Sequence, residues 1–288
     1  MPTEPRPLSS STASLIPIAW APAFAADAKA LASRRGFPLL GERENLRAEA
    51  EPLVLWLDDA GLSLRQTGPR AMGPVRCDFV AGEVRHRRLY GGGKSQSIAK
   101  AVGIKDGLRP RVADLTAGMG GDALALAGLG CRVVLVERHP VVAALLADGL
   151  RRAREAAAID ADLAELVARI TLVCRDSREW LADCGPDERP DVIYLDPMFP
   201  ERRKSAQVNK SMQIFHQLVG ADSDADDLLP LALDTARHRV VVKRPSHAPW
   251  LGGVKPGLCF EGKSVRFDVY PLRAMAGRLT SDVGRKGP

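Results

Sequence analysis

The sequence predicts an α/β fold whose main part is a doubly wound, mostly parallel sheet that ends in an antiparallel hairpin. From about residue 110 onward, short apolar segments alternate with segments that have the amphipathic spacing of helices. Strands that are apolar along their whole length are buried on both faces, as in a parallel sheet covered by crossover helices. The last two strands are joined by too few residues for a crossover helix, so they should form a hairpin.

The elements of this sheet follow one another along the chain. The predicted strands cover residues 110–116, 131–137, 170–176, 191–196, 239–243, 257–262 and 264–271. The predicted helices cover residues 121–130, 139–157, 178–184 and 225–236. Glycine ends the first of these helices, and the last is expected to form although it contains Pro230.

A small α+β domain is expected before the sheet, over residues 13–84. It contains predicted strands at 14–20 and 52–58, a helix at 24–35, and further strands broken by Gly and Pro turns within 62–80. The sheet domain should then span residues 85–276. A disordered lead is expected at 1–12 and a flexible tail at 277–288.

The composition is typical of a globular protein with an excess of positive charge. Apolar residues make up 45% and charged residues 26% of the chain. The sequence contains no run of eighteen apolar residues, which is about the length that a membrane-spanning helix needs. The polar, proline-rich start lacks a signal-peptide pattern, which favours a cytoplasmic location. The five cysteines are scattered without a CxxC pair, so no metal site is expected. The net charge of +6 suggests an anionic partner.

The first strand of the sheet leads into a glycine-rich loop, Asp-Leu-Thr-Ala-Gly-Met-Gly-Gly-Asp at 114–122. Glycines let the backbone turn sharply and approach a ligand, and ligands of open α/β sheets bind at the carboxyl ends of the strands. Gly118, Gly120 and Ala123 also fit the GxGxxA pattern of a nicotinamide site. That alternative does not explain Asp114, a carboxylate that would suit the cationic amino group of a methionine.

Polar side chains follow the next two strands as well. Glu137 and Arg138 end the second strand, and a carboxylate there can accept both hydroxyls of a ribose. Asp176 and Ser177 follow the third strand, where an acid and a hydroxyl can hydrogen-bond an adenine amine. Ser177 alone is better explained as part of a helix cap. Together with the glycine loop, these strand ends predict a pocket for adenosine.

The fourth strand ends in Asp-Pro-Met-Phe-Pro at 196–200, which resembles the Asp/Asn-Pro-Pro-Tyr/Phe motif of amino-methyltransferases. The exocyclic amine of a base is a poor nucleophile, because its lone pair is delocalised into the ring. Hydrogen bonds to Asp196 and a backbone carbonyl would favour a pyramidal nitrogen and aim the lone pair at a methyl group. Pro197 stiffens the loop, and Phe199 offers a face on which a flipped base can stack. Asp196, Pro197 and Phe199 are therefore the predicted catalytic residues.

Several segments between about residues 78 and 270 resemble the ribosomal RNA small subunit methyltransferase J family. They are the glycine loop, ERHPVVAALL, YLDPMFP, KSA and VVVKRP. The resemblance implies a Rossmann-like methyltransferase sheet that uses S-adenosylmethionine to methylate the 2-amino group of a guanine in small-subunit ribosomal RNA. It implies cofactor contacts at Gly121, Asp122, Glu137, Arg138, Asp176, Ser177 and Asp196. Relatives often carry arginine at the position of Gly121 and a small hydroxyl residue at that of Asp176.

Three basic clusters are expected to ring one edge of the sheet and to contact RNA. They comprise Arg87, Arg88 and Lys94; Arg202, Arg203 and Lys204; and Lys243 and Arg244. The first cluster is no P-loop, because Arg88 stands where the motif requires its first glycine. That segment could have a function, as an RNA contact or as a flap over the cofactor. Alternatively, it is only a solvated basic linker.

Two other functions fit the same residues. The acceptor amine could belong to a DNA adenine or to a protein glutamine instead of RNA. Alternatively, the chain could be a non-enzymatic RNA-binding assembly factor with a vestigial cofactor pocket, although the full set of strand-end acids argues against this. The nucleotide modified, the choice between naked rRNA and an assembling subunit, and the oligomeric state stay open.

Overall fold

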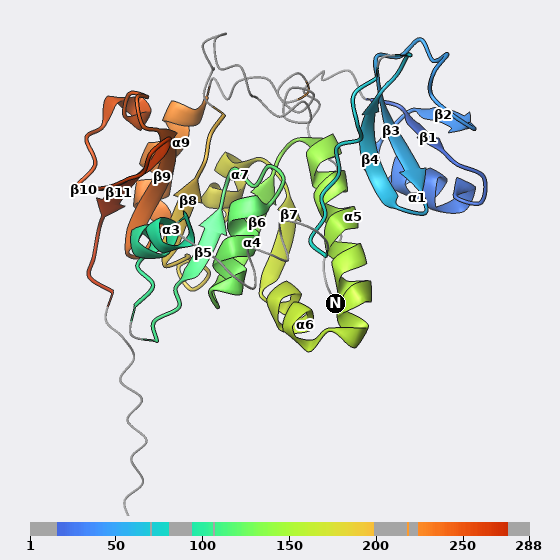
Figure 1. Ribbon diagram of the computed structural model, residues 1–288. Helices are drawn as coiled ribbons and strands as arrows, with labels where there is room; N and C mark the ends of the chain where they lie inside the picture. Colours follow the sequence, from blue (N-terminus) through green and yellow to red (C-terminus); the bar gives the residue numbers. More distant parts are fainter. Residues whose placement is uncertain are drawn as a thin grey trace, which may run out of the picture.

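The computed structural model describes residues 16–69, 71–80, 94–105, 107–198, 218 and 224–275, and only the backbone of 94–96 (Figure 1). Several predictions lie outside the described residues. They concern the lead, the tail, the domain boundary at 84–85, Arg87, Arg88, the Lys94 side chain, Phe199, Arg202, Arg203 and Lys204. Within the described ranges, no helix is both long and apolar enough to cross a membrane.

Seven strands of the described chain form the main sheet, in the order β10-β11-β9-β8-β5-β6-β7 (Figure 1). The strands are β5 (Arg111–Asp114), β6 (Arg132–Glu137), β7 (Ile170–Cys174), β8 (Val192–Leu195), β9 (Arg239–Pro245), β10 (Leu258–Glu261) and β11 (Val265–Pro271). All neighbours pair in parallel except at β11, which is antiparallel to both β9 and β10. The predicted doubly wound sheet and its terminal hairpin are thus confirmed.

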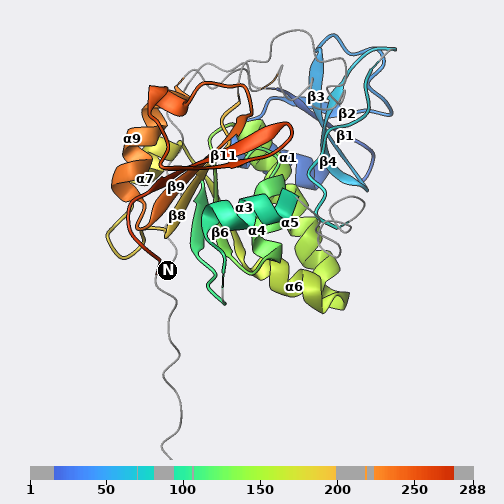
Figure 2. The same cartoon turned by 60° about the vertical axis from the view of Figure 1, so that its left-hand side comes forward.

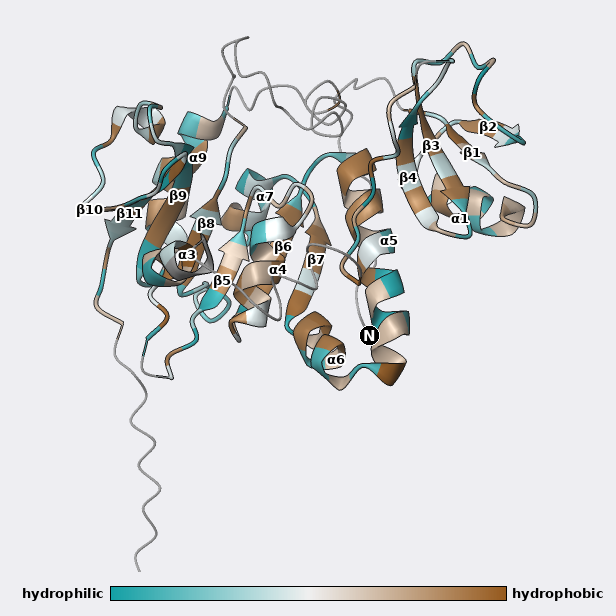
Figure 3. Ribbon diagram, in the orientation of Figure 1, coloured by the Kyte–Doolittle hydropathy of each residue, from teal (hydrophilic) through white to brown (hydrophobic). Residues whose placement is uncertain are grey.

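Helices cover both faces of this sheet (Figure 2). They are α3 (Lys94–Val102), α4 (Gly121–Gly128), α5 (Pro140–Ala156), α6 (Ala161–Ala168), α7 (Ser177–Ala182) and α9 (Ala225–Thr235). Val112 and Val192 belong to the core shared with α3, α4, α5 and α6. Ala113 and Ile193, one residue further on, belong to the core shared with α7 and α9. Alternate residues of a strand point to opposite faces, so the middle of a strand buried on both sides must be apolar, and the interior strands β8 and β9 are largely hydrophobic in Figure 3.

Two helices of the sheet domain were not predicted. The α3 helix begins at the end of the basic segment, at Lys94, and its residues Ile98, Ala101 and Val102 are buried in the core. The α6 helix follows Asp160, whose side chain caps it by accepting from the backbone N of Leu163 at 2.9 Å. In α9 the helix continues through Pro230, as expected.

A second sheet is formed by strands near the N-terminus, in the order β2-β1-β3-β4 within the described residues. Its elements are β1 (Ile18–Trp20), α1 (Ala25–Arg35), β2 (Leu39–Glu42), β3 (Leu53–Asp58) and β4 (Gly61–Gln66). The predicted helix and strands are confirmed here, whereas β2 was not predicted. After β4, the chain returns to the sheet at a single bridge between Leu64 and Val75. Ile18 and Leu62 of this sheet share a buried cluster with Leu146 of α5.

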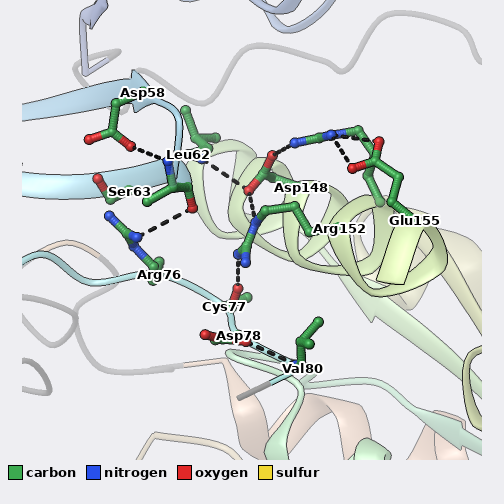
Figure 4. A network of polar contacts seen from close by, with 12 residues as sticks. Asp58, Leu62, Ser63, Arg76, Cys77, Asp78, Val80, Asp148, Arg152 and Glu155 are labelled. Carbon is green, nitrogen blue, oxygen red and sulfur yellow. Dashed lines mark hydrogen bonds and ion pairs between the residues drawn. The ribbon is translucent and has the colours of Figure 1, made fainter. Parts of the chain in front are cut away.

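A polar network holds the small sheet against α5 (Figure 4). Oδ2 of Asp148 accepts from the backbone N of Leu62 at 3.0 Å and from Nε of Arg152 at 2.8 Å. Arg152 also donates to the carbonyl oxygen of Cys77. Gly149 lies at this contact, because a Cβ added there would be 2.7 Å from Cβ and 2.9 Å from the carbonyl oxygen of Cys77. The helix therefore needs glycine at this position.

Gly149→Ala is expected to lower the free energy of unfolding by about 1–3 kcal/mol, because the added methyl group overpacks the contact with Cys77. This should happen although alanine is the better helix former by about 1 kcal/mol. Gly128→Ala in α4 is the matched control, since a Cβ there meets its nearest neighbour, Leu166, at an ordinary 3.8 Å. Urea unfolding measures the free energy of unfolding of both variants. Equal stability of the two variants would contradict the close packing at Gly149.

Candidate active site

The glycine loop between β5 and α4 is fixed on one side and open on the other. Gly118 and Gly120 have φ values of 52° and 74°, in the left-handed region that favours glycine. A Cβ on Gly120 would lie 3.0 Å from Leu146 and 3.1 Å from Phe79. Around a Cβ built on Gly121, in contrast, no described atom lies within 4 Å. The loop thus packs on the protein and leaves space at the first residue of α4, where backbone N–H groups have no partner within the helix.

Two predicted cofactor residues tie this loop to the neighbouring strands. Glu137 is 8% exposed, and its carboxylate accepts from the backbone N of Gly118 at 3.0 Å and of His139 at 2.8 Å. Ser177 is buried, and its hydroxyl donates to the carbonyl oxygen of Leu115 at 2.6 Å. These side chains therefore set the shape of the sheet edge at which the cofactor was predicted to bind.

Beyond β6 and β7, four charged side chains form a network. Asp176 caps α7 by accepting from the backbone N of Arg178 at 2.9 Å. Arg138 donates to both carboxylate oxygens of Asp224, at 2.6 and 3.0 Å, and lies 3.8 Å from Asp176. Arg178 lies 3.1 Å from Asp224. Burial works to raise the pKa of Asp176, but the hydrogen bonds from Arg178 outweigh it and lower that pKa. The network joins the start of α9 to the predicted adenine side of the pocket.

One ammonium group bridges two carboxylates at the centre of the sheet edge. Nζ of Lys243 donates to Oδ2 of Asp122 and to Oδ2 of Asp196, each at 2.7 Å. The hydroxyl of Tyr194 donates to the same oxygen of Asp122 at 2.7 Å. With Asp114, these two acids form a group of three carboxylates, which we call the acid cluster. It contains residues from the glycine loop and from the predicted catalytic strand end.

Asp114 is connected to this group through Thr116. Its Oδ1 accepts from the backbone N of Thr116 at 3.1 Å, and the hydroxyl of Thr116 accepts from the backbone N of Asp196 at 2.6 Å. Burial raises the pKa of Asp114 to about 8, and the charges of Asp122 and Asp196 act in the same direction. Burial opposes the charge of Lys243, but Asp196 and Asp122 outweigh it and raise the pKa of that ammonium. At neutral pH, Lys243 is therefore charged and Asp114 is largely protonated.

Strand register explains why these residues meet. Asp114 of β5 pairs with Tyr194 of β8, and Leu195 of β8 pairs with Val242 of β9, so Asp196 leaves β8 beside Lys243. Side chains two residues apart on a strand share a face. Tyr194 belongs to the core on the α4 side, so all of these polar groups point toward the first turn of α4, which carries Asp122.

All ten predicted cofactor residues lie at the carboxyl ends of β5, β6, β7 and β8 or in the first turns of the helices that follow. They are Asp114, Gly118, Gly120, Gly121, Asp122, Glu137, Arg138, Asp176, Ser177 and Asp196, and Pro197 follows the last of them. The two basic residues of β9 have partners within the protein. Lys243 lies in the acid cluster, and the buried Arg244 donates to the carbonyl oxygen of Pro249 at 3.2 and 3.1 Å.

Thr116, Tyr194 and Asp224 were not predicted as site residues. The spacing of Tyr194 and Asp196, two residues apart on one strand, is the signal that would have linked Tyr194 to the site. No comparable pattern connects Asp224 with Arg138, because 86 residues separate them in the sequence.

Comparison with known proteins identifies the family. Residues 40–272 match a family model described as "Putative SAM-dependent methyltransferase". A protein of Cellvibrio japonicus, named ribosomal RNA small subunit methyltransferase J, is 52% identical over 262 residues, which cover 90% of this chain and 98% of that protein. A protein of the same name from Pseudomonas fluorescens is 52% identical over 254 residues, covering 88% of this chain and 93% of that protein. The chain belongs to this family.

A solved structure agrees with the family assignment. The crystal structure of a SAM-dependent methyltransferase from Neisseria gonorrhoeae is 37% identical, with a TM-score of 0.66, and the match covers 88% of this chain and 95% of that one. The fold is therefore that of an S-adenosylmethionine-dependent methyltransferase, and S-adenosylmethionine is the cofactor. The site fits such a ligand, because the acid cluster matches the sulfonium and ammonium charges of the cofactor and the space at Gly121 is open.

Asp114→Asn is expected to make the stability of the protein less dependent on pH. The pKa of Asp114 rises from an ordinary 3.8 to about 8 in the folded state. Between these values the folded state binds more protons than the unfolded state, so stability falls as pH rises, by at most about 1.4 kcal/mol per pH unit. Asparagine keeps the acceptor for Thr116 but does not titrate. Urea unfolding at pH 5 and pH 8 measures the difference, and an equal loss of stability in both proteins would exclude a protonated Asp114.

Proposed function

We propose that this chain transfers the methyl group of S-adenosylmethionine to the exocyclic 2-amino group of a guanine in small-subunit (16S) ribosomal RNA. The observation that carries the proposal is the position of Asp196, which leaves β8 at the carboxyl edge of the sheet inside the acid cluster and is followed by Pro197. The names of the relatives support small-subunit rRNA as the substrate. The 2-amino group of guanine follows from the family resemblance of the sequence. The proposed location is the cytoplasm, where ribosomal subunits are assembled.

Asp196 is proposed to act on the acceptor nitrogen. Its carboxylate accepts an N–H of the amine, which favours a pyramidal nitrogen with its lone pair directed at the methyl group. The negative charge also stabilises the positive charge that develops on this nitrogen. Pro197 restricts the backbone, and Phe199 stacks on the flipped base, a contact worth about 1–3 kcal/mol. The cofactor supplies a methyl group on a sulfonium that leaves readily, so alignment provides most of the rate.

The remaining strand ends are proposed to hold the cofactor. Asp114, Asp122 and Asp196 face its cationic groups, and Gly118, Gly120 and Gly121 give it access to the backbone of the loop. Glu137 and Arg138 are the proposed ribose contacts, and Asp176 and Ser177 the proposed adenine contacts. Because the Ser177 hydroxyl already donates to Leu115, its oxygen would contact the adenine amine as an acceptor.

RNA binding is proposed for the basic residues that flank the site in the sequence. They are Arg87, Arg88 and Lys94 before the sheet, and Arg202, Arg203 and Lys204 after the catalytic loop. The net charge of +6 supports this assignment. Residues 13–84 are proposed to form a domain that positions the substrate, next to a catalytic domain at 85–276.

Asp196→Asn is expected to lower kcat for rRNA methylation by about 10²–10³-fold, because the amide lacks the negative charge that stabilises the developing cation. Methyl transfer to small-subunit rRNA from a deletion strain, followed by mass spectrometry, measures this. Asp191→Asn is the matched control. Asp191 lies at the other end of the same strand, where its carboxylate accepts from the backbone N of Arg111 at 2.8 Å, and its substitution should leave kcat unchanged.

The deletion strain and labelled cofactor also distinguish this function from the two alternative functions. An unchanged pattern of guanine methylation in the deletion strain would reject the proposed substrate. Labelled cofactor incubated with separate RNA, DNA and protein fractions then tests a DNA adenine or a protein glutamine as the acceptor. Full biological activity of Asp196→Ala in the deletion strain would favour a non-enzymatic assembly factor.

A further inference from the structure

We propose that Lys243 is a positioning residue of the active site, which holds the carboxylates of Asp196 and Asp122 in place and does not contact RNA. This inference rests on the proposed role of Asp196. The observation behind it is the pair of 2.7 Å hydrogen bonds from one ammonium group to two acids on different elements. Asp122 stands in the first turn of α4, at the cofactor loop, and Asp196 follows β8, at the acceptor side. Lys243 therefore fixes the spacing between the two halves of the site.

The backbone of Lys243 is well suited to this task. It lies on β9, an interior strand that is hydrogen-bonded to β8 on one side and to β11 on the other. The side chain is 24% exposed, so most of its stem is packed within the protein. A charged group carried by a rigid, interior strand holds its partners more accurately than one carried by a loop.

The charges around Lys243 argue against a phosphate contact. Two carboxylates, Asp122 of α4 and Asp196 at the end of β8, both bind the single ammonium group of Lys243. To bind an RNA phosphate, Lys243 would have to leave Asp122 and Asp196, or bring the phosphate next to them. If Lys243 left the two acids, their negative charges would face each other without the ammonium between them. If the phosphate came next to them, its negative charge would be close to both carboxylates. Both arrangements oppose phosphate binding. A positioning role, in contrast, requires only the existing hydrogen bonds of Lys243 to Asp122 and Asp196.

Two substitutions separate positioning from RNA contact. Lys243→Met removes the ammonium and keeps a long apolar stem, and kcat is expected to fall about 100-fold through misalignment of Asp196. Lys243→Arg keeps the charge, but a planar guanidinium spreads its donors over separate nitrogens and cannot reproduce a single bridging one. Its kcat should lie between those of the wild type and the Met variant. Lys255→Met, in an exposed loop, removes the same charge and should leave kcat unchanged.

RNA binding provides the second measurement. Fluorescence anisotropy with a 16S rRNA fragment, over a range of salt concentrations, gives the affinity and its salt dependence without any turnover. Positioning predicts an unchanged Kd for RNA and an unchanged salt slope in both Lys243 variants. A lost phosphate contact would instead make the log–log slope shallower by about 1 in Lys243→Met and leave Lys243→Arg close to the wild type.

Wild-type kcat in Lys243→Arg, or a shallower salt slope in Lys243→Met with kcat unchanged, would overturn the proposal. Circular dichroism and thermal unfolding identify a variant that fails to fold, and the charge-conserving Arg variant then decides alone. Failure of the proposed function is recognised separately, because the wild type itself would not methylate guanine in 16S rRNA. In that case the same variants are compared on the acceptor that the labelled-cofactor experiment identifies.

Discussion

The in-register parallel pairing of β5, β8 and β9 is the constraint on which the site depends. Each of these strands alternates between two buried faces, so a shift of one residue would exchange the two apolar sets and turn the polar strand ends away from α4. Burial of each Val or Ile side chain on these strands contributes about 1.5–3 kcal/mol, which strongly favours a single register. The same register brings Asp114, Tyr194, Asp196 and Lys243 to one edge. The hydrophobic core therefore positions the charged groups.

The charges at this edge balance one another only in part. A single ammonium group binds the carboxylates of Asp122 and Asp196, and the buried Asp114 nearby holds a proton at neutral pH. Asp122 and Asp196 carry like charges that repel, and one ammonium group compensates only one of them. This arrangement suits a cationic cofactor and a reaction in which positive charge develops on an amine, since the negative groups are already oriented before the reaction begins. The site is thus built for cations, and RNA phosphates are better matched by basic residues around it.

Much of the fold could be predicted because it follows from local patterns. Uninterrupted apolar strands, glycine-terminated helices and the short link before β11 were sufficient for the sheet and its hairpin. The α3 helix was not predicted, because the three consecutive glycines and the basic residues before it indicate a loop. Its apolar face is explained only by its packing against the sheet. In the site, each strand-end acid could be predicted from its own position. The partners of Lys243 could not be predicted. Its charge suggested an RNA contact, whereas its contacts with Asp122 and Asp196 are set by the register of β8 and β9.

The α5 helix connects the small sheet to this edge. It begins at Pro140, directly after the strand end that carries Glu137 and Arg138, and eight residues later Asp148 binds the backbone of Leu62 in β4. Eight helical residues span about 12 Å, so one rigid helix joins the proposed ribose contacts to the small sheet. The close approach of Gly149 to Cys77 leaves little freedom for one part to slide over the other. A substrate held by the small sheet would therefore be held at a fixed position relative to the cofactor, which is what alignment of an amine with a methyl group requires.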